Sequence, residues 1–252
     1  MIKILLGGAN GKMGKVIAGI VSEDPNVKIV AGLDINDTPY DDFPIFKSPT
    51  DINISADVII DFSHPSLFDS LLNYACKNKI PTVLATTGLS EEQSKKLDTC
   101  KTEVAIFQSA NMSIGINLLI DLVEKASRIL EDNFDIEIIE KHHNQKIDAP
   151  SGTALVIADA IMNACNSPKE YVYDRHSVRR KRRKEEIGIH SVRGGTIVGE
   201  HEVIFAGKDE IFEIKHTAAS KDIFAVGAVK AAKFLAGKQP GLYHMKDLVS
   251  EI

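Results

Sequence analysis

No stretch of this 252-residue sequence stays apolar for the roughly 20 residues that a helix needs to cross a bilayer. The chain also opens directly into a strand-like run at Ile2, without the pattern of a signal peptide. Internal repeats and low-complexity tracts are missing too. These absences argue against membrane-spanning, secreted and repeat proteins, so we expect a folded cytoplasmic chain with no membrane partner.

Cysteine is scarce, and Cys76, Cys100 and Cys165 lie far apart in the sequence with no closely spaced pair. A disulfide framework or a zinc site normally shows cysteines at characteristic spacings. We therefore expect neither, and we interpret all three cysteines as reduced, structural residues.

An excess of positive charge is absent as well, because 30 lysines and arginines face 35 acidic residues, for a net charge of -5. This balance argues against a general nucleic-acid-binding protein but allows local positive patches that attract an acidic metabolite. The one dense basic run covers residues 179–184, with Glu185 and Glu186 directly after it and no aromatic residues within it. We interpret this run as a solvated loop and expect no nucleic-acid partner.

What the sequence does contain is a regular alternation of short apolar runs and helical patterns over its first part. Strands are expected over residues 2–6, 28–33, 58–62, 82–86 and 104–107, and helices over residues 12–21 and 67–78. Ser90 and Gln93 have the spacing of a capping box, which predicts a further helix running towards Cys100. Strands separated by helices predict a doubly wound parallel sheet, the Rossmann-like fold of dinucleotide-binding domains.

The pattern changes in the second part of the chain. Helices are expected over residues 115–130, 153–165 and 223–235, and strands over residues 134–138, 196–205 and 211–216. Strands without helices between them predict an antiparallel or mixed sheet, and the last helix suits packing back on the first domain. We expect an α/β protein with a discontinuous dinucleotide domain, residues 1–112 and 220–252. An α+β substrate-binding and oligomerisation domain would cover residues 113–219.

Gly8, Gly11 and Gly14 stand between the first strand and the first helix, where a chain must turn sharply and let a pyrophosphate approach its backbone. The amino end of the helix offers the phosphates unpaired N–H groups. Tight turns elsewhere use glycines too, but the position after the first strand favours a dinucleotide. Asp34 ends the second strand, where an acidic residue binds the adenosine ribose, although a surface-turn aspartate is the alternative.

The choice between NADH and NADPH depends on the same residues. Asp34 would repel a 2′-phosphate, and Ile35 rather than an arginine follows it. We therefore expect NADH to be at least as good a cofactor as NADPH, although Lys12 is able to reach a 2′-phosphate.

The densest reactive chemistry lies between a predicted strand and a predicted helix, where loops place functional side chains. His142, His143 and Lys146 precede a Ser-Gly-Thr turn at residues 151–153, and the helix that opens there can bind a carboxylate at its amino end. A metal site is the first alternative, but no cysteine or His-x-x-x-His pattern accompanies the pair. A purely structural role for both histidines is the second.

Five segments, in order along nearly the whole chain, resemble the signatures of the dihydrodipicolinate (4-hydroxy-tetrahydrodipicolinate) reductase family. They are GGANGKMG at residues 7–14, ATTGL at 85–89, SANMSIGIN at 109–117, EKHHNQKIDAPSGTA at 140–154 and GGTIVGEH at 194–201. The resemblance implies an oxidoreductase of lysine and diaminopimelate biosynthesis, a homotetramer with NADH or NADPH as cofactor and a small cyclic dicarboxylate as substrate.

The resemblance also implies roles for individual residues. Dinucleotide contacts would fall on Gly8, Ala9, Asn10, Gly11, Lys12, Met13, Asp34, Ala85, Thr86, Thr87, Ser109, Ala110, Asn111 and Met112. His142 would donate a proton, Lys146 would be a second donor or charge partner, and substrate would contact His143, Gly152 and Thr153. Two positions depart from the family, which often has phenylalanine at Met112 and a basic residue at Asn144.

In the implied reaction the substrate loses water to give a conjugated imine, hydride adds to the ring at C4, and a proton quenches the displaced electrons. Histidine suits that proton transfer because its unperturbed pKa is about 6.5. Two other functions stay open from the sequence: a dehydrogenase acting on an amino acid such as aspartate or homoserine, and a non-catalytic sensor of NAD(H). The two histidines before Pro-Ser-Gly-Thr argue against the first, and intact His142 and Lys146 disfavour the second.

Overall fold

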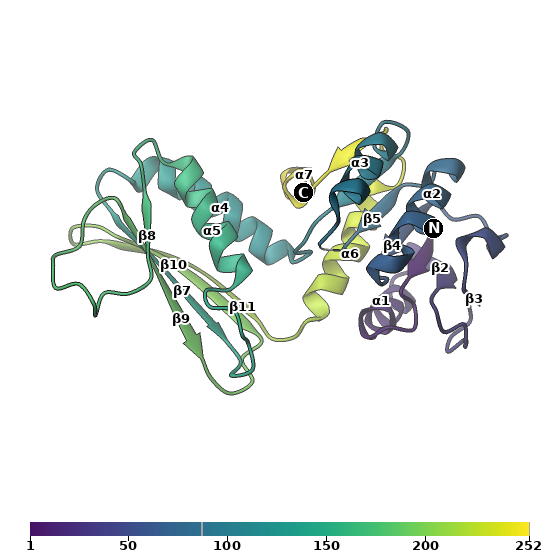
Figure 1. The fold of residues 1–252 in the computed structure, drawn as a ribbon, viewed down its shortest axis with the longest axis horizontal. Helices are drawn as coiled ribbons and strands as arrows, with labels where there is room; N and C mark the ends of the chain where they lie inside the picture. Colours follow the sequence, from purple (N-terminus) through teal and green to yellow (C-terminus); the bar gives the residue numbers. More distant parts are fainter. Residues whose placement is uncertain (87, 252) are drawn as a thin grey trace. The chain divides into compact units, whose positions relative to one another are not determined.

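The computed structural model describes residues 1–86 and 88–251. The chain forms two compact units (Figure 1). Unit 1 combines Met1–Ile114 with the chain from Asp222 onwards, and unit 2 is Gly115–Lys221. No helix in the described ranges is long and apolar enough to cross a membrane.

Unit 1 is built on a seven-stranded parallel sheet with strand order β12-β6-β5-β4-β1-β2-β3. The strands are β1 (Ile2–Gly7), β2 (Val27–Leu33), β3 (Ile45–Phe46), β4 (Val58–Asp61), β5 (Thr82–Leu84), β6 (Ala105–Gln108) and β12 (Gly241–Tyr243). The order grows outwards in both directions from β1, which leaves a crevice at the carboxyl ends of the strands where doubly wound sheets bind ligands. The predicted α/β class is therefore confirmed.

Helices cover both faces of this sheet because its strands are apolar on both sides. One face packs against α1 (Lys12–Ser22), α6 (Asp222–Leu235) and α7 (Met245–Glu251). The other packs against α2 (Phe68–Asn78) and α3 (Glu91–Cys100), with the short helices η1 (Pro49–Asp51) and η2 (Pro65–Leu67) nearby in sequence. Both hydrogen bonds of the predicted capping box are present, since Ser90 and Gln93 each bind the other's backbone N–H.

The expectation for the cysteines is wrong for two of them. Cys76 in α2 and Cys100 at the end of α3 form a disulfide, with their Cα atoms 5.8 Å apart. The packing of two helices against the same sheet face brings these residues together, and spacing along the sequence cannot reveal that. Cys165 is a free, partly buried thiol whose pKa is raised by burial to about 11.

Unit 2 contains a five-stranded mixed sheet with strand order β11-β10-β7-β9-β8. Its elements are α4 (Ile114–Leu130), β7 (Asp135–His142), α5 (Gly152–Ala164), β8 (Glu170–Val172), β9 (Glu186–Arg193), β10 (Gly199–Ala206) and β11 (Ile211–Ala218). β10 runs antiparallel to β7 and β11, whereas β9 runs parallel to β7 and β8. A mixed sheet was predicted, but β8 and β9 were not.

The two faces of this sheet differ. Helices α4 and α5 cover one face with an apolar core that includes Ile138, Ile157 and Phe205. The other face, which we call the open face, is formed by the alternate residues of each strand. Across the strands, one row contains Lys141, Val192, Glu200 and Thr217, and the next contains Ile139, His190, Glu202 and Lys215. These side chains are half-buried or exposed, so the open face mixes apolar and charged groups.

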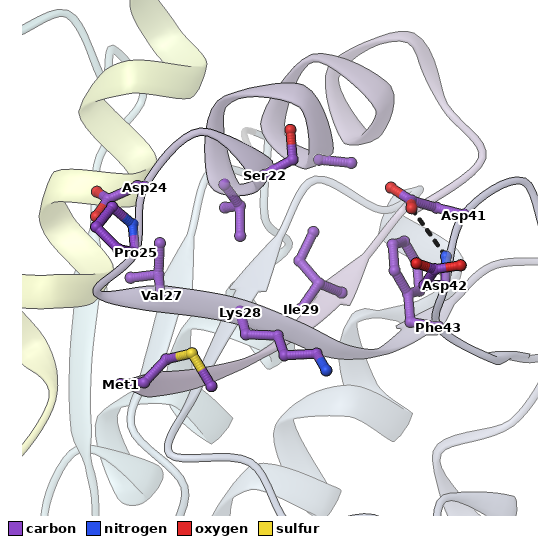
Figure 2. A pocket seen from close by; sticks show the side chains of 12 residues that line it. Met1, Ser22, Asp24, Pro25, Val27, Lys28, Ile29, Asp41, Asp42 and Phe43 are labelled. Atoms are coloured by element: carbon purple, nitrogen blue, oxygen red, sulfur yellow. Dashed lines mark hydrogen bonds between the residues drawn. The ribbon is translucent and has the colours of Figure 1, made fainter.

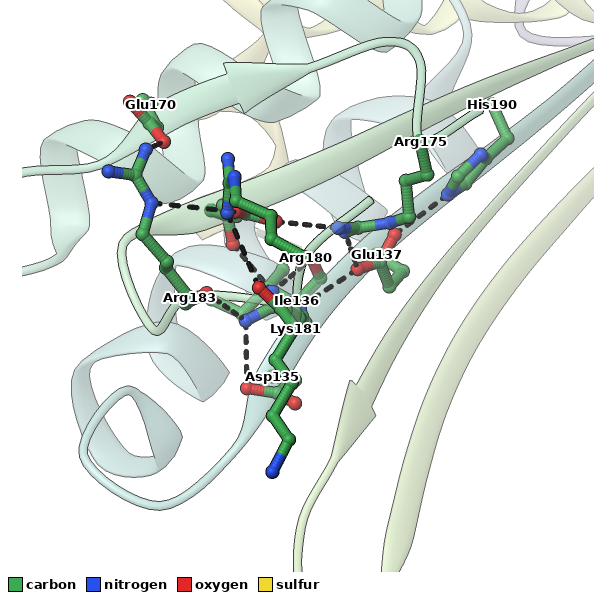
Figure 3. Close-up of polar contacts among 11 residues, drawn as sticks. Asp135, Ile136, Glu137, Glu170, Arg175, Arg180, Lys181, Arg183 and His190 are labelled. Carbon is green, nitrogen blue, oxygen red and sulfur yellow. Dashed lines mark hydrogen bonds and ion pairs between the residues drawn. The ribbon is translucent and has the colours of Figure 1, made fainter. Parts of the chain in front are cut away.

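The basic run at residues 179–184 lies in a loop between β8 and β9, as predicted. Its arginines nevertheless have acidic partners, which the sequence analysis did not anticipate. Arg182 binds Asp135 at 2.8 Å and Glu137 at 3.0 Å. Figure 3 shows Arg175 and His190 also directed at Glu137, from 2.6 and 2.7 Å, while the Lys181 side chain points away. Acidic side chains thus pair with Arg180, Arg182 and Arg183, and these ion pairs reduce the positive charge that the run presents.

Candidate active site

The turn between β1 and α1 has the geometry of a phosphate cradle. Gly8 has a φ of +74°, and a Cβ there would lie 2.5 Å from the carbonyl oxygen of Phe62. A Cβ on Gly14 would collide with the carbonyl oxygen of Gly8. Gly11, the N-cap of α1, supplies no side-chain cap, so the first N–H groups of the helix remain available to an anion. These features fit the diphosphate of a dinucleotide.

Asp34 lies directly beside this turn. Its carboxylate accepts hydrogen bonds from the backbone N–H groups of Asn10, at 2.9 Å, and Asn36, at 3.1 Å. The Tyr40 hydroxyl donates to the carbonyl oxygen of Ala9 at 2.9 Å, which draws the following loop against the turn. Ala9, predicted to contact the dinucleotide, is fully buried, and its N–H and carbonyl bind Leu33 and Tyr40 within the chain. The predicted phosphate and ribose positions are thus adjacent in space.

A second group of predicted residues gathers at the carboxyl ends of β5 and β6. A hollow of about 350 Å³ is lined there by Thr86, Gly88, Leu89, Gln108, Ser109, Ala110 and His244. Asn111 and Ser109 bind each other through the Ser109 hydroxyl, whereas Met112 is buried in the core. Thr87, also predicted to contact the cofactor, lies outside the described residues. Ala85 is half-buried and packs against the core.

Sequence reasoning missed two polar residues next to this hollow. Asp61, at the end of β4, is fully buried and accepts hydrogen bonds from the Ser63 N–H at 2.9 Å and the Thr86 hydroxyl at 3.2 Å. Burial raises the pKa of its carboxyl group. His244 lies 3.0 Å from the Gln108 carbonyl oxygen through Nδ1, which must donate because a carbonyl only accepts. An aspartate that ends an apolar strand was the available signal for Asp61.

Another hollow, of about 310 Å³, lies along α1 and β2 (Figure 2). Met1, Val27 and Lys28 line it, so it opens at the amino ends of β1 and β2. The glycine turn follows the carboxyl end of β1. This hollow is therefore not the dinucleotide crevice.

The reactive motif of unit 2 is organised around a buried carboxylate. Glu140 and His142 lie two residues apart on β7 and therefore on the same face of the sheet. His142 Nδ1 lies 2.6 Å from Glu140 Oε2, and Arg193 of β9 grips both carboxylate oxygens, at 2.6 and 2.8 Å. Burial opposes ionisation of Glu140, but the hydrogen bonds from Arg193 and His142 outweigh it and lower its pKa to about 2.

A second buried histidine borders this group. The His201 ring of β10 lies edge-on to the His142 ring, with centroids 5.3 Å apart, and its Nε2 is 3.1 Å from the Ser151 hydroxyl. Burial and the neighbouring His142 lower the pKa of His201 to about 4, so it is neutral near pH 7. A Cβ on Gly199 would come within 3.2 Å of His142 Nε2, so glycine leaves room for the imidazole.

The remaining predicted residues surround the amino end of α5. Ser151 is the N-cap, and its hydroxyl accepts from the Ala154 N–H at 3.2 Å. Lys146 Nζ lies 2.8 Å from Asp148, and this contact, with a smaller contribution from the Gly152 N–H, lowers the pKa of Asp148. Gly152 and Thr153 form the exposed and half-buried first turn of the helix, and His143 is half-buried just beyond β7. In the described ranges no three histidine, cysteine or acidic side chains converge on a metal position.

A parallel-sheet unit with a phosphate cradle, joined to a unit that offers an imidazole, an ammonium group and the amino end of a helix, defines a dinucleotide-dependent reductase. Two family models match this chain: the amino-terminal part of dihydrodipicolinate reductase over residues 2–112, and the carboxyl-terminal part over residues 115–249. The chain belongs to the dihydrodipicolinate reductase family, whose members use NAD(P)H.

Relatives with the name 4-hydroxy-tetrahydrodipicolinate reductase match over almost their whole length. The one from Caldanaerobacter subterraneus subsp. tengcongensis is 54% identical, covering 100% of this chain and 99% of the relative. The one from Clostridium novyi is 50% identical, covering 99% and 98%. A solved structure of dipicolinate-bound dihydrodipicolinate reductase from Paenisporosarcina sp. TG-14 superposes with a TM-score of 0.83, at 26% identity and 97% coverage of both chains.

Proposed function

We propose that this chain reduces 4-hydroxy-tetrahydrodipicolinate to tetrahydrodipicolinate with a hydride from NADH or NADPH and a proton from His142. Family membership carries the reductase activity and its place in lysine and diaminopimelate biosynthesis. The new elements of the proposal are the roles of individual residues and the preference between the two cofactors.

The cofactor supplies the hydride, and the residues of unit 1 bind it. The tight turn that Gly8 and Gly14 allow and the uncapped end of α1 support a diphosphate at this turn. Asp34 would accept hydrogen bonds from the ribose hydroxyls beside Asn10. The same carboxylate would repel a 2′-phosphate, so we infer that NADH serves at least as well as NADPH.

The observation that carries the proton-donor role is the orientation of His142. A carboxylate with a pKa of about 2 is ionised at neutral pH and can only accept, so His142 Nδ1 must hold a proton towards Glu140. Nε2 of the imidazolium form is then the nitrogen that can give a proton to the substrate. Delivery of this proton to the ring carbon that receives the electrons displaced by the hydride completes the reduction and leaves a neutral imidazole.

The substrate is a dianion, and unit 2 offers two cationic features for its carboxylates. Lys146 supplies an ammonium group, and the amino end of α5, at Gly152 and Thr153, supplies the positive end of the helix dipole. The Lys146 ammonium group already forms an ion pair with the Asp148 carboxylate. This contact shows that its position suits a carboxylate, which supports the proposed function. His143 follows directly and would contact the same ligand.

We also infer a homotetramer that assembles through the open face of unit 2. A sheet face with Ile139 in its centre and Val192 at 43% exposure is more apolar than a solvated surface requires. Lys141 and Lys215 both pair with Glu200 there, so its charges are largely compensated within the chain. Such a face can be buried in a symmetric assembly at little electrostatic cost.

Replacing His142 tests the reaction. His142→Gln should lower kcat by about 10²-fold or more, because the general acid is lost, while the dissociation constant for NADH stays within about twofold. NADH oxidation with freshly prepared substrate gives kcat, and fluorescence titration gives NADH affinity. His176→Gln, on an exposed loop of the same unit, is the control and should leave kcat unchanged. Wild-type turnover by His142→Gln would rule out the proton-donor role.

A further inference from the structure

Glu140 is a fully buried carboxylate at the centre of unit 2, and its contacts exceed what charge neutralisation requires. Arg193 alone satisfies both oxygens in a forked ion pair. Glu140 nevertheless also accepts from His142 Nδ1 at 2.6 Å and from the backbone N–H of Ser151 at 3.1 Å. One carboxylate therefore links the imidazole to the N-cap of α5.

Burial of an ion pair of this kind is costly, and an apolar replacement of similar volume is often as stable or more stable. Stability alone therefore gives little reason for Glu140 and Arg193 at this place. Glu186 offers a comparison within the same chain, because it is also buried and Arg175 binds it at 2.6 Å. It is the first residue of β9, and Arg193 is the last. Its partners are surface-loop arginines, and no functional candidate contacts it in the described ranges.

We propose that Glu140, clamped by Arg193, is the positioning residue that sets the tautomer and ring orientation of His142 and ties this ring to the substrate-binding end of α5. The inference rests on the proposed proton-donor role of His142. A proton on Nδ1 stays with Glu140 throughout, so Nε2 alone exchanges its proton. After Nε2 has given its proton to the ring carbon, the neutral imidazole keeps the same tautomer and can be reprotonated at Nε2 by solvent.

Glu140→Gln should invert this arrangement. The two donors of Arg193 would take the amide oxygen, so the amide NH₂ would face His142 Nδ1, which then has to accept. The neutral ring would carry its proton on Nε2 instead, and the imidazolium form would lose its carboxylate partner. We expect kcat to fall by about 10²-fold, with KM for NADH within about twofold of wild type.

The direct readout is the tautomer of His142 in ¹H–¹⁵N multiple-bond correlation spectra of histidine-labelled protein above pH 8. The signals are assigned by their absence in His142→Gln. Wild type should show Nδ1 protonated, and Glu140→Gln should show Nε2 protonated. Glu186→Gln is the matched control, since it removes an equally buried, arginine-bound carboxylate, and should leave both tautomer and kcat unchanged.

The variants distinguish the proton-donor role of His142 from the positioning role of Glu140. Wild-type turnover by His142→Gln would refute the proton donor, whatever Glu140→Gln does. An inactive His142→Gln together with a Glu140→Gln variant of wild-type kcat and unaltered tautomer would refute only the positioning role. Should Glu140→Gln fail to fold, Arg193→Lys keeps a cation but loses the fork, and we expect an intermediate loss of kcat with a mixed His142 tautomer. A wild-type kcat and a single Nδ1 tautomer in that variant would overturn the proposal.

Discussion

At the scale of single residues, the dinucleotide turn and the reactive motif have opposite requirements. Gly8 and Gly14 act by lacking a side chain, because a Cβ would meet the backbone of Phe62 at the first position and the backbone of the turn at the second. His142 acts through a side chain whose nitrogen atoms are distinguished only by their neighbours. The sequence predicted both sets of residues, but Arg193, Glu140 and His201, which organise the imidazole, received no role. Their contacts join three strands and have no local sequence pattern.

Asp34 is the residue on which we propose that the preference between NADH and NADPH depends. Asp34→Asn removes the negative charge next to the ribose, so KM for NADPH should fall relative to KM for NADH by about tenfold or more. Steady-state kinetics with both cofactors measures the ratio. Asp37→Asn, three residues further on and paired with Lys47 at the surface, should leave the ratio within twofold of wild type. An unchanged ratio in Asp34→Asn would mean that this carboxylate does not face the 2′ position.

At the scale of elements, the sequence predicted α1 to α6 but not α7 (Met245–Glu251), and two of the predicted helices begin at a recognisable cap. Ser90 with Gln93 starts α3, and Ser151 starts α5, both as side-chain caps. The short strands β3, β8 and β12 were not predicted, since two or three residues carry no periodicity. β9 was missed for another reason: its buried first half includes Glu186 and Gly188 and therefore lacks an apolar run.

The two caps allow a comparison of stability with function. Ser151→Ala and Ser90→Ala should each lower the free energy of unfolding by about 1 kcal/mol, because each leaves one helix N–H without its acceptor. Only Ser151→Ala should also raise KM for the substrate, by an estimated threefold or more, since α5 alone is proposed to bind a carboxylate. Urea unfolding and steady-state kinetics give the two quantities. Equal values of KM for the substrate in the two variants would mean that α5 does not bind the substrate.

At the scale of the whole molecule, the two units differ in how many faces of their sheets are covered by helices. Unit 1 covers both faces of its sheet with helices from its own chain, whereas α4 and α5 cover only one face in unit 2. The change of pattern near residue 113 was visible in the sequence, as strands stopped alternating with helices. The disulfide between Cys76 and Cys100 was not, because only the packed helices reveal it.

Assembly can be tested on the open face of unit 2. Wild type should sediment at about four times the 27.6 kDa chain mass. Ile139→Lys places a charge in the centre of the open face beside Glu202, and we expect it to shift sedimentation towards smaller species. Ile129→Lys, on α4 with 79% exposure, is the control and should sediment like wild type. A tetramer that survives Ile139→Lys would place the interface elsewhere.

The two ends of the chain meet in unit 1, and this has a bearing on synthesis. The ribosome releases residues 115–221 before it makes α6, whose apolar residues Ala228, Ala232 and Leu235 complete the core of unit 1 beside β4 and β5. Domains generally fold as units while translation proceeds. The mixed-sheet module can therefore mature first, while the nascent nucleotide fold still exposes Ile4 and Ile60. Until α6 has been made, the half of the protein that is synthesised first is therefore the half whose core is still incomplete.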